Sequence, residues 1–327
     1  MTALSLGAPR AFAFVPMDEP GAPSPHEALV QVRAVGICGT DVSGYRGKMP
    51  FIQYPRILGH ELGVEILAVG SAVEHLQPGD RCAVEPYLNC GHCAPCRNGR
   101  TNCCETLQVL GVHCDGGLRP RLLLPAAKLH VASDLSFEQL ALVETLGIGC
   151  HAVNRAEVQA SDTVLVIGAG PIGLSVVEFA RLTGATVHVL EPHAGRREFV
   201  QKHYNVEVHE HLAPSPFADV IFDATGSAAS MSRACEFARF SGRVVFVGIT
   251  TDAVPLNDAL FHRRELTLLA SRNALATDFK RILQLVQEGR CNPQHWVSQR
   301  IPFTETPAAF AEIDAGANVV KAIVTLP

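Results

Sequence analysis

The sequence predicts an α/β protein in which a β-rich domain is joined to a doubly wound parallel sheet. Three observations lead to this fold class. The first third has short apolar strands separated by Gly/Pro turns, and residues 162–289 alternate between apolar strands and helices. The C-terminal stretch returns to short strands with one helix and is therefore expected to rejoin the β-rich domain. Alternation of apolar strands with helices is typical of a parallel sheet covered on both faces.

The composition is that of a globular protein long enough for two hydrophobic cores. The 327 residues are 47% apolar and 18% charged, and the formal net charge is -5. This balance provides no basic surface for nucleic acid, and no window approaches the roughly 18 consecutive apolar residues of a membrane span. The N-terminus lacks a basic region followed by an unbroken apolar segment. We therefore expect no signal peptide, no membrane or nucleic-acid partner, and a cytoplasmic location.

The first third is expected to be mostly β structure, without a helix. Residues 27–37 alternate as a strand does, and residues 63–86 fit strand, turn and strand, with Pro78-Gly79-Asp80 as the turn. A further β-like segment covers residues 118–132.

Residues 136–153 have apolar positions at helical spacing, with Ser136 as a candidate N-cap. Glu144 interrupts this apolar helix. Either it lies on a solvated face or it belongs to a metal site, because an isolated buried carboxylate costs several kcal/mol.

The segment from Val35 to Val64 holds a first candidate metal site. Cys38 follows a short apolar run, and His60 and Glu61 come shortly after Gly59. A thiolate, an imidazole and a carboxylate are ligands that suit zinc. On its own this pattern is also compatible with a buried cysteine and a capping histidine.

A second, stronger metal signal lies in residues 90–104, CGHCAPCRNGRTNCC. Four thiolates on a short lobe are what a closed tetrahedral zinc site requires. An iron–sulfur cluster is the competing metal, and a disulfide would need an oxidising compartment. Cys103 competes with its neighbour Cys104 as the fourth ligand, and we prefer Cys104. The predicted ligands are Cys90, Cys93, Cys96 and Cys104.

Residues 162–191 carry a glycine-rich turn between a buried strand and a helix. Its pattern is G-x-G-x-x-G, which lets the backbone approach a pyrophosphate at a helix N-terminus. Glu191 ends the next strand, where an acid binds the ribose hydroxyls and repels a 2′-phosphate. NAD is therefore favoured over NADP, although Arg196 and Arg197 have the reach to bind a phosphate. The predicted cofactor-binding residues are Gly168, Gly170, Pro171, Ile172, Gly173, Glu191 and Arg196.

The alternation of strands and helices continues after residue 191. The expected strands are 218–226, 242–250 and 265–271, and the expected helices are 230–240 and 276–289.

Together these motifs, in this order, resemble the zinc-dependent medium-chain dehydrogenase/reductase superfamily over nearly the whole chain. Glu144 in LVETLGIG and the SRNA segment at 271–274 are similar to the sorbitol, polyol and sugar-acid branch. The resemblance implies a GroES-like catalytic domain (1–143 and 272–327) carrying the 90–104 zinc lobe. It implies a Rossmann dinucleotide-binding domain over 144–271.

The resemblance also implies roles for the first candidate site. Cys38, His60 and Glu144 match catalytic zinc ligands, and Glu61 is able to bind directly or through water. Thr40 matches the hydroxyl that takes the substrate proton, and Asp41 matches the carboxylate that orients the ligand histidine.

One position departs from the family pattern. Ser43 stands where relatives often have a histidine that releases the proton, and a serine does not titrate near neutral pH. Ribose hydroxyls, water or another group must then carry the proton away.

The implied activity is hydride transfer from a secondary alcohol of a polyol, sugar or sugar acid to NAD, with one catalytic and one structural zinc per chain. The alternatives are a threonine-dehydrogenase-like or simple-alcohol dehydrogenase, and a non-catalytic NAD-binding protein that has kept the fold. A homodimer or homotetramer is expected by analogy, with the strand near residues 265–270 as the contact.

Overall fold

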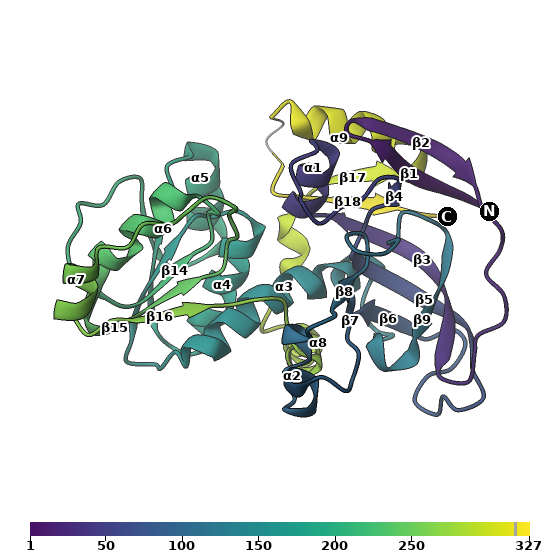
Figure 1. Cartoon of the computed structure of the whole chain (residues 1–327), viewed down its shortest axis with the longest axis horizontal. Helices are drawn as coiled ribbons and strands as arrows, with labels where there is room; N and C mark the ends of the chain where they lie inside the picture. Colours follow the sequence, from purple (N-terminus) through teal and green to yellow (C-terminus); the bar gives the residue numbers. More distant parts are fainter. Residues whose placement is uncertain (317–318) are drawn as a thin grey trace. The chain divides into compact units, whose positions relative to one another are not determined.

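The computed structural model describes residues 1–316 and 319–327 and divides the chain into two compact units (Figure 1). One unit comprises Met1–Glu144 with Leu275–Pro327, and the other comprises Thr145–Ala274. The two boundaries thus follow residues 144 and 274, compared with the expected 143 and 271. Glu144 closes the first segment of the β-rich unit.

The β-rich unit is built on a seven-stranded sheet. Strand β3 is central and pairs antiparallel with both β5 and β18. The C-terminal strand therefore does rejoin the N-terminal unit. The order is β10 (Leu129–Val131), β6 (Arg81–Val84), β5 (Glu61–Val69), β3 (Glu27–Ile37), β18 (Lys321–Thr325) and β17 (Val297–Pro302), with β9 (Arg121–Pro125) also paired to β3.

Two smaller sheets complete this unit. The first has the order β2 (Ala11–Pro16), β1 (Thr2–Ala8) and β4 (Arg56–Ile57), and the second pairs β7 (Tyr87–Leu88) with β8 (Gln108–Val109). Alternate residues of β3 and β5, such as Val30, Val32, Leu62 and Val64, are fully buried in a shared core. That core holds the ends of β3 and β5 in register, and the first metal motif lies at those ends.

The expectation of no helix in the first third was wrong. Helix α1 (Gly39–Tyr45) follows β3 directly, and a single turn, α2 (Ala94–Arg97), lies in the cysteine lobe. The carboxylate of Asp41 accepts a hydrogen bond from the Cys38 N–H at 2.9 Å, which satisfies a free donor at the start of α1. At seven residues, α1 is too short to show an apolar period.

The second unit is a six-stranded parallel sheet, so the doubly wound prediction is confirmed. Figure 1 draws it in teal to green. Its order is β13 (Glu207–His209), β12 (Thr186–Leu190), β11 (Thr163–Ile167), β14 (Ala218–Asp223), β15 (Ala238–Phe246) and β16 (Thr267–Ala270). Its connecting helices include α4 (Pro171–Leu182), α5 (Ala194–His203), α6 (Ala228–Ala234) and α7 (Asp258–Arg263).

The helix expected over 230–240 ends earlier than predicted. Helix α6 stops at Ala234, a 3-10 turn covers Cys235–Phe237, and β15 begins at Ala238. The buried guanidinium of Arg264 donates to the carbonyls of Cys235, Glu236 and Ala238 at 2.8–3.2 Å. The guanidinium binds carbonyls that would accept hydrogen bonds if the helix continued. Arg264 lies far from α6 in the sequence, so the local pattern could not predict this early end.

The remaining helices agree closely with the sequence pattern. They are α3 (Phe137–Ala156), α8 (Ala276–Gln287) and α9 (Thr306–Asp314). Among the described residues, no helix combines the length and apolar character needed to cross a membrane.

Candidate active site and cofactor site

The first metal motif converges at the end of β3 and the start of β5. The Sγ of Cys38, a ring nitrogen of His60 and a carboxylate oxygen of Glu61 all lie within 4.8 Å of one another. His60 is 5% exposed and Glu61 is 0% exposed. Two segments distant in the sequence thus bring sulfur, nitrogen and oxygen donors to one buried point.

Asp41 connects these two segments. One carboxylate oxygen accepts from the Cys38 N–H, and the other accepts from the Gly59 N–H at 3.3 Å. The latter oxygen lies 3.6 Å from Nδ1 of His60. Although burial alone lowers the pKa of His60, the charge of Asp41 raises it well above its usual value. Asp41 thus lies where it would orient the His60 ring, with Nδ1 turned toward the carboxylate.

Glu61 has a buried counter-ion. Lys321, which is 1% exposed and begins β18, donates from Nζ to both carboxylate oxygens at 2.6 and 2.8 Å. Burial lowers the pKa of Lys321, but the negative charge of Glu61 outweighs it and the net pKa is raised. Sequence reasoning did not single out Lys321, because its partner lies 260 residues away.

Gly36 is the residue that makes room for Glu61. A Cβ added there would lie 1.9 Å from Oε2 of Glu61. The opposed pair Gly36 and Glu61 in the β3–β5 register therefore requires a glycine on one strand.

Glu144 occupies a different environment from Glu61. It is 5% exposed and accepts a hydrogen bond from the hydroxyl of the fully buried Tyr87. Burial raises the pKa of Glu144, and the charge of His60 partly opposes that shift. The reading of Glu144 as a solvated surface residue was wrong, yet Glu144 is outside the set of donors that lie within 4.8 Å of one another.

Thr40 and Ser43 lie three residues apart on α1, and both are partly buried. Residues at this spacing share one face of a helix. The turn that carries Cys38 and Asp41 therefore also carries both predicted proton-handling hydroxyls.

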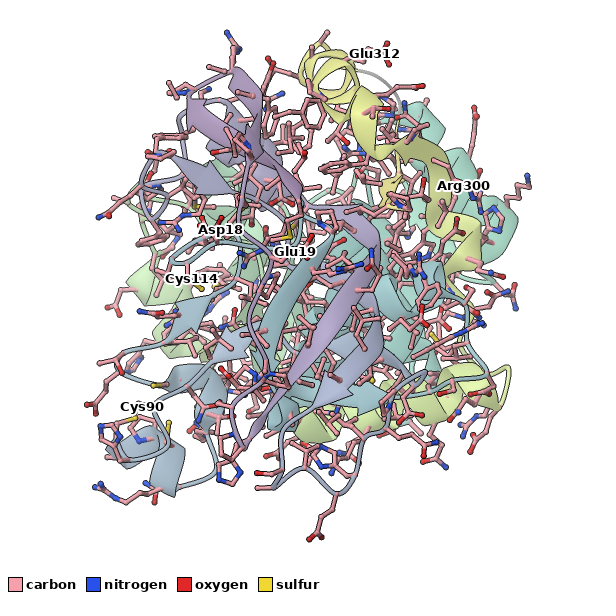
Figure 2. All side chains as sticks on the ribbon, turned by 90° about the vertical axis from the view of Figure 1, so that its right-hand side faces the viewer. Asp18, Glu19, Cys90, Cys114, Arg300 and Glu312 are labelled. Carbon is pink, nitrogen blue, oxygen red and sulfur yellow. The ribbon has the colours of Figure 1, made fainter. Side chains whose placement is uncertain are left out.

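The second metal motif is a compact four-cysteine lobe. The sulfurs of Cys90, Cys93, Cys96 and Cys104 lie within 4.8 Å of one another, whereas Cys103 is exposed and outside the group. Figure 2 labels Cys90 on this lobe, with further sulfur atoms beside it. None of the eleven cysteines, all of which are described by the structure, forms a disulfide, so no disulfide competes for these sulfurs.

Backbone N–H groups of the lobe prepare two of its thiols to ionise. Donors from His92 and Cys93 lower the pKa of Cys90 to about 6. The N–H of Cys90 lowers that of Cys104. Desolvation raises the pKa of Cys96 to about 11, so these donors favour ionisation of Cys90 and Cys104 only. Thiolates are the metal-binding form of cysteine, and the convergence of four sulfurs fits a closed zinc site.

The glycine-rich turn has the geometry that the dinucleotide motif requires. Gly168 adopts φ +93°, and a Cβ on Gly173 would lie 1.9 Å from the carbonyl oxygen of Gly168. Gly170, the N-cap of α4, has no other residue within 4 Å of a Cβ position. The turn therefore leaves open space at a helix N-terminus, which fits a pyrophosphate.

Glu191 lines the same cavity as Gly168 and Gly170 of the glycine-rich turn. Its two carboxylate oxygens accept from the N–H groups of Ala169 and His193, both at 2.8 Å, and it is 3% exposed. Arg196 lies 3.7 Å from the same carboxylate. The cavity beside Glu191, of about 560 Å³, is lined by Gly168, Gly170, Glu191 and Arg196. It is also lined by residues that the sequence analysis missed, among them Glu210, Thr225 and Arg233.

A sequence signal for Thr225 did exist, because it lies two residues beyond the end of a buried parallel strand. Asp223 ends β14 and accepts hydrogen bonds from the Thr225 N–H and hydroxyl and from the Ser230 hydroxyl. Ligands of open α/β sheets bind beyond the carboxyl ends of the strands. The segment 223–226, DATG, could therefore have been predicted to contribute to the cofactor site together with the glycine-rich turn.

A GroES-like unit with two thiolate-containing metal motifs, and a six-stranded parallel sheet with a dinucleotide turn, define the class of zinc-dependent dehydrogenases. Residues 24–134 match the alcohol dehydrogenase GroES-like domain, and residues 171–288 match the zinc-binding dehydrogenase domain. The chain belongs to the zinc-containing medium-chain alcohol dehydrogenase family.

Its relatives include dehydrogenases of sugar acids and polyols that are 31–36% identical. L-galactonate-5-dehydrogenase of Escherichia coli (strain K12) is 36% identical over 318 residues, which is 93% of each chain. The solved structures that share the fold include two with a TM-score of 0.92. The short chain alcohol dehydrogenase rspB from E. coli CFT073, in complex with NADH, is 28% identical over 100% of this chain and 99% of its own. A zinc-binding dehydrogenase from Sinorhizobium meliloti 1021, bound to NADP, is 30% identical over 99% of both chains.

Proposed function

We propose that this dehydrogenase oxidises a secondary hydroxyl of a sugar acid or polyol, with NAD as the hydride acceptor. The observation that carries the proposal is the buried convergence of Cys38, His60 and Glu61. The names of the sugar-acid and polyol relatives indicate the substrate class.

We propose that Cys38, His60 and Glu61 hold the catalytic zinc. Their sulfur, nitrogen and oxygen donors match a catalytic site with three protein ligands. When bound there, zinc supplies Lewis-acid polarisation of the alcohol oxygen. Glu144, held by Tyr87, then supports the site as a buried hydrogen-bonding carboxylate.

We propose that hydroxyl groups on α1 accept the proton that the alcohol releases. The hydroxyl of Thr40 both accepts and donates, so it can take the proton and pass it on. Ser43, on the same face of α1, provides a second hydroxyl in place of an imidazole. Proton release therefore lacks a group titrating near neutral pH at this position, and turnover is expected to rise toward alkaline pH.

We propose NAD over NADP because Glu191 places a buried carboxylate at the ribose end of the pocket. A 2′-phosphate there would meet a fixed negative charge whose two oxygens are already hydrogen-bonded. Arg196 reduces this repulsion from 3.7 Å away. Together these contacts predict a preference for NAD rather than absolute selectivity.

A substrate panel tests the activity. Purified protein with two zinc ions per chain is assayed with aldonates, alditols, aldoses, threonine and simple alcohols, by the absorbance of the reduced nicotinamide. We expect turnover with an aldonate or alditol and NAD. No reduction of either cofactor across the panel would contradict the proposal, and turnover confined to threonine or simple alcohols would replace its substrate class.

The matched variants are Cys38→Ser and Cys82→Ser. Cys82 is a buried cysteine of β6 outside both metal motifs. We expect Cys38→Ser to lose one zinc and nearly all activity, and Cys82→Ser to keep both zinc ions. Full activity in Cys38→Ser would refute the assignment of the site.

A further inference from the structure

Three metal-binding side chains lie together at the outer edge of the parallel sheet and have no part in the dehydrogenase site. They are His188 on β12 and Glu207 and His209 on the edge strand β13. His188 is directly opposite Glu207 in the parallel register, and His209 is two residues further along. Alternate residues of a strand share a face, so the sheet presents all three side chains on one side.

Their ligand atoms form a small triangle. Nδ1 of His188 is 3.2 Å from Nε2 of His209 and 3.2 Å from Oε2 of Glu207. The third side, from Nε2 of His209 to Oε2 of Glu207, is 3.8 Å. Zinc–nitrogen and zinc–oxygen bonds of about 2.0–2.2 Å in a tetrahedral site separate neighbouring ligand atoms by roughly 3.3–3.6 Å. The triangle already has the size of one face of such a site.

Hydrogen bonding alone does not account for the close approach of these three groups. An ionised carboxylate only accepts, and each neutral imidazole carries one proton. A single N–H between the rings cannot satisfy both the partner nitrogen and the carboxylate with good geometry.

We propose that His188, Glu207 and His209 form a third metal site, for a borderline divalent transition-metal ion such as Zn²⁺. Two imidazoles and a carboxylate are donors that suit this class of ion. The two rings are stacked, with their planes inclined by 17° and their centroids 5.5 Å apart, so they must reorient to aim both lone pairs at the ion. The Glu207 side chain is 71% exposed, which gives the ion a route from solvent.

Binding at this site would join the edge strand to its neighbour. Strand β13 has three residues and pairs only with β12 among the described strands. The carbonyl of His209 accepts from the N–H of Glu191 at 3.0 Å. A metal held by β12 and β13 would therefore stabilise the backbone that carries the ribose-binding carboxylate.

Equilibrium dialysis against Zn²⁺ tests the proposal on the full-length protein isolated with its two family zinc ions. We expect the wild-type protein to take up one further zinc, and His188→Gln/His209→Gln to take up none. Glu207→Gln removes an exposed charge without threatening the fold, and it should weaken the extra binding by more than about tenfold, the least that supporting residues of metal sites cost. The same Zn²⁺ should raise the Tm of the wild type and not that of Glu207→Gln.

Two controls separate this site from other sources of zinc binding. His211→Gln removes an imidazole that is 84% exposed two residues beyond His209, and it should retain the extra ion. Cys38→Ser should also retain it, which distinguishes it from refilling of the catalytic site. Equal uptake by the wild type, His188→Gln/His209→Gln and Glu207→Gln, or no further zinc bound by the wild type, would overturn the proposal.

Discussion

Glu61 and Glu144 are both buried acids, but their partners differ. Glu61 faces Cys38 and His60 and is neutralised by Lys321, whereas Glu144 is held by Tyr87. The proposed site therefore has Glu61, rather than Glu144, as the direct metal ligand.

Exchanging each acid for its amide tests this difference. Glu61→Gln should lower the zinc content from two ions to one and reduce kcat/KM at least about a hundredfold, the upper range of losses for residues that merely support a ligand. Glu144→Gln should keep both zinc ions. Zinc analysis and steady-state kinetics measure both effects, and zinc loss confined to Glu144→Gln would reverse the assignment. Glu61→Gln/Lys321→Met controls for the lysine left buried without its partner.

Gly36 is expected to control the position of Glu61 through space alone. Gly36→Ala would place a methyl group 1.9 Å from Oε2 of Glu61, so the carboxylate must move. We expect a loss of about 1–3 kcal/mol of unfolding free energy from overpacking, together with loss of the catalytic zinc. Urea unfolding and zinc counting measure the two effects.

Gly39→Ala is the matched control for this change. Gly39 begins α1 nearby and has no other residue within 4 Å of a Cβ position. It should keep full zinc content and near-normal stability. Equal behaviour of the two variants would show that the close approach at Gly36 has no consequence.

At the scale of the element, two glycines in the turn between β11 and α4 serve different purposes, one in folding and the other in cofactor binding. A Cβ at Gly173 meets the carbonyl of Gly168 at 1.9 Å, whereas a Cβ at Gly170 points into open space. Gly173→Ala should therefore lower stability, and Gly170→Ala should fold normally but bind NADH more weakly, because the methyl group occupies the approach of the pyrophosphate. Thermal unfolding and fluorescence titration with NADH check this split. Weak binding with lost stability in both variants would contradict it.

The cysteine lobe offers a test between neighbouring residues. Cys104→Ser should lose the structural zinc and destabilise the protein, because metal binding at such sites contributes directly to folding. Cys103→Ser should do neither, since Cys103 is exposed and outside the cluster. Zinc analysis with thermal unfolding decides, and zinc loss in Cys103→Ser alone would exchange the two roles.

At the scale of the whole molecule, the preferred cofactor should stabilise the folded protein more than the other cofactor does. NADH at about 100 times its Kd should add about 2.7 kcal/mol to the free energy of unfolding, and NADPH at the same concentration should add less because of Glu191. Differential scanning fluorimetry compares the two cofactors on the wild type and on Glu191→Gln. Equal shifts for both cofactors on the wild type would remove the argument for NAD.

The sequence by itself determined the fold class, the glycine turn and the two metal motifs. These depend on local signals, namely strand and helix periods, glycines at a strand–helix junction and cysteines a few residues apart. It also predicted the parallel sheet and the return of the C-terminus to the first unit, because apolar strands alternating with helices allow few topologies.

The tertiary structure decided what depends on distant partners. These contacts are the pairing of Glu61 with Lys321, the pairing of Glu144 with Tyr87, and the capture of carbonyls after α6 by the Arg264 guanidinium. They join residues from 26 to 260 positions apart. The convergence of His188 with Glu207 and His209 depends on strand register. None of these contacts produces a periodic or short-range pattern in the sequence. The partner of a buried charge is set by the folded backbone, which brings distant residues together.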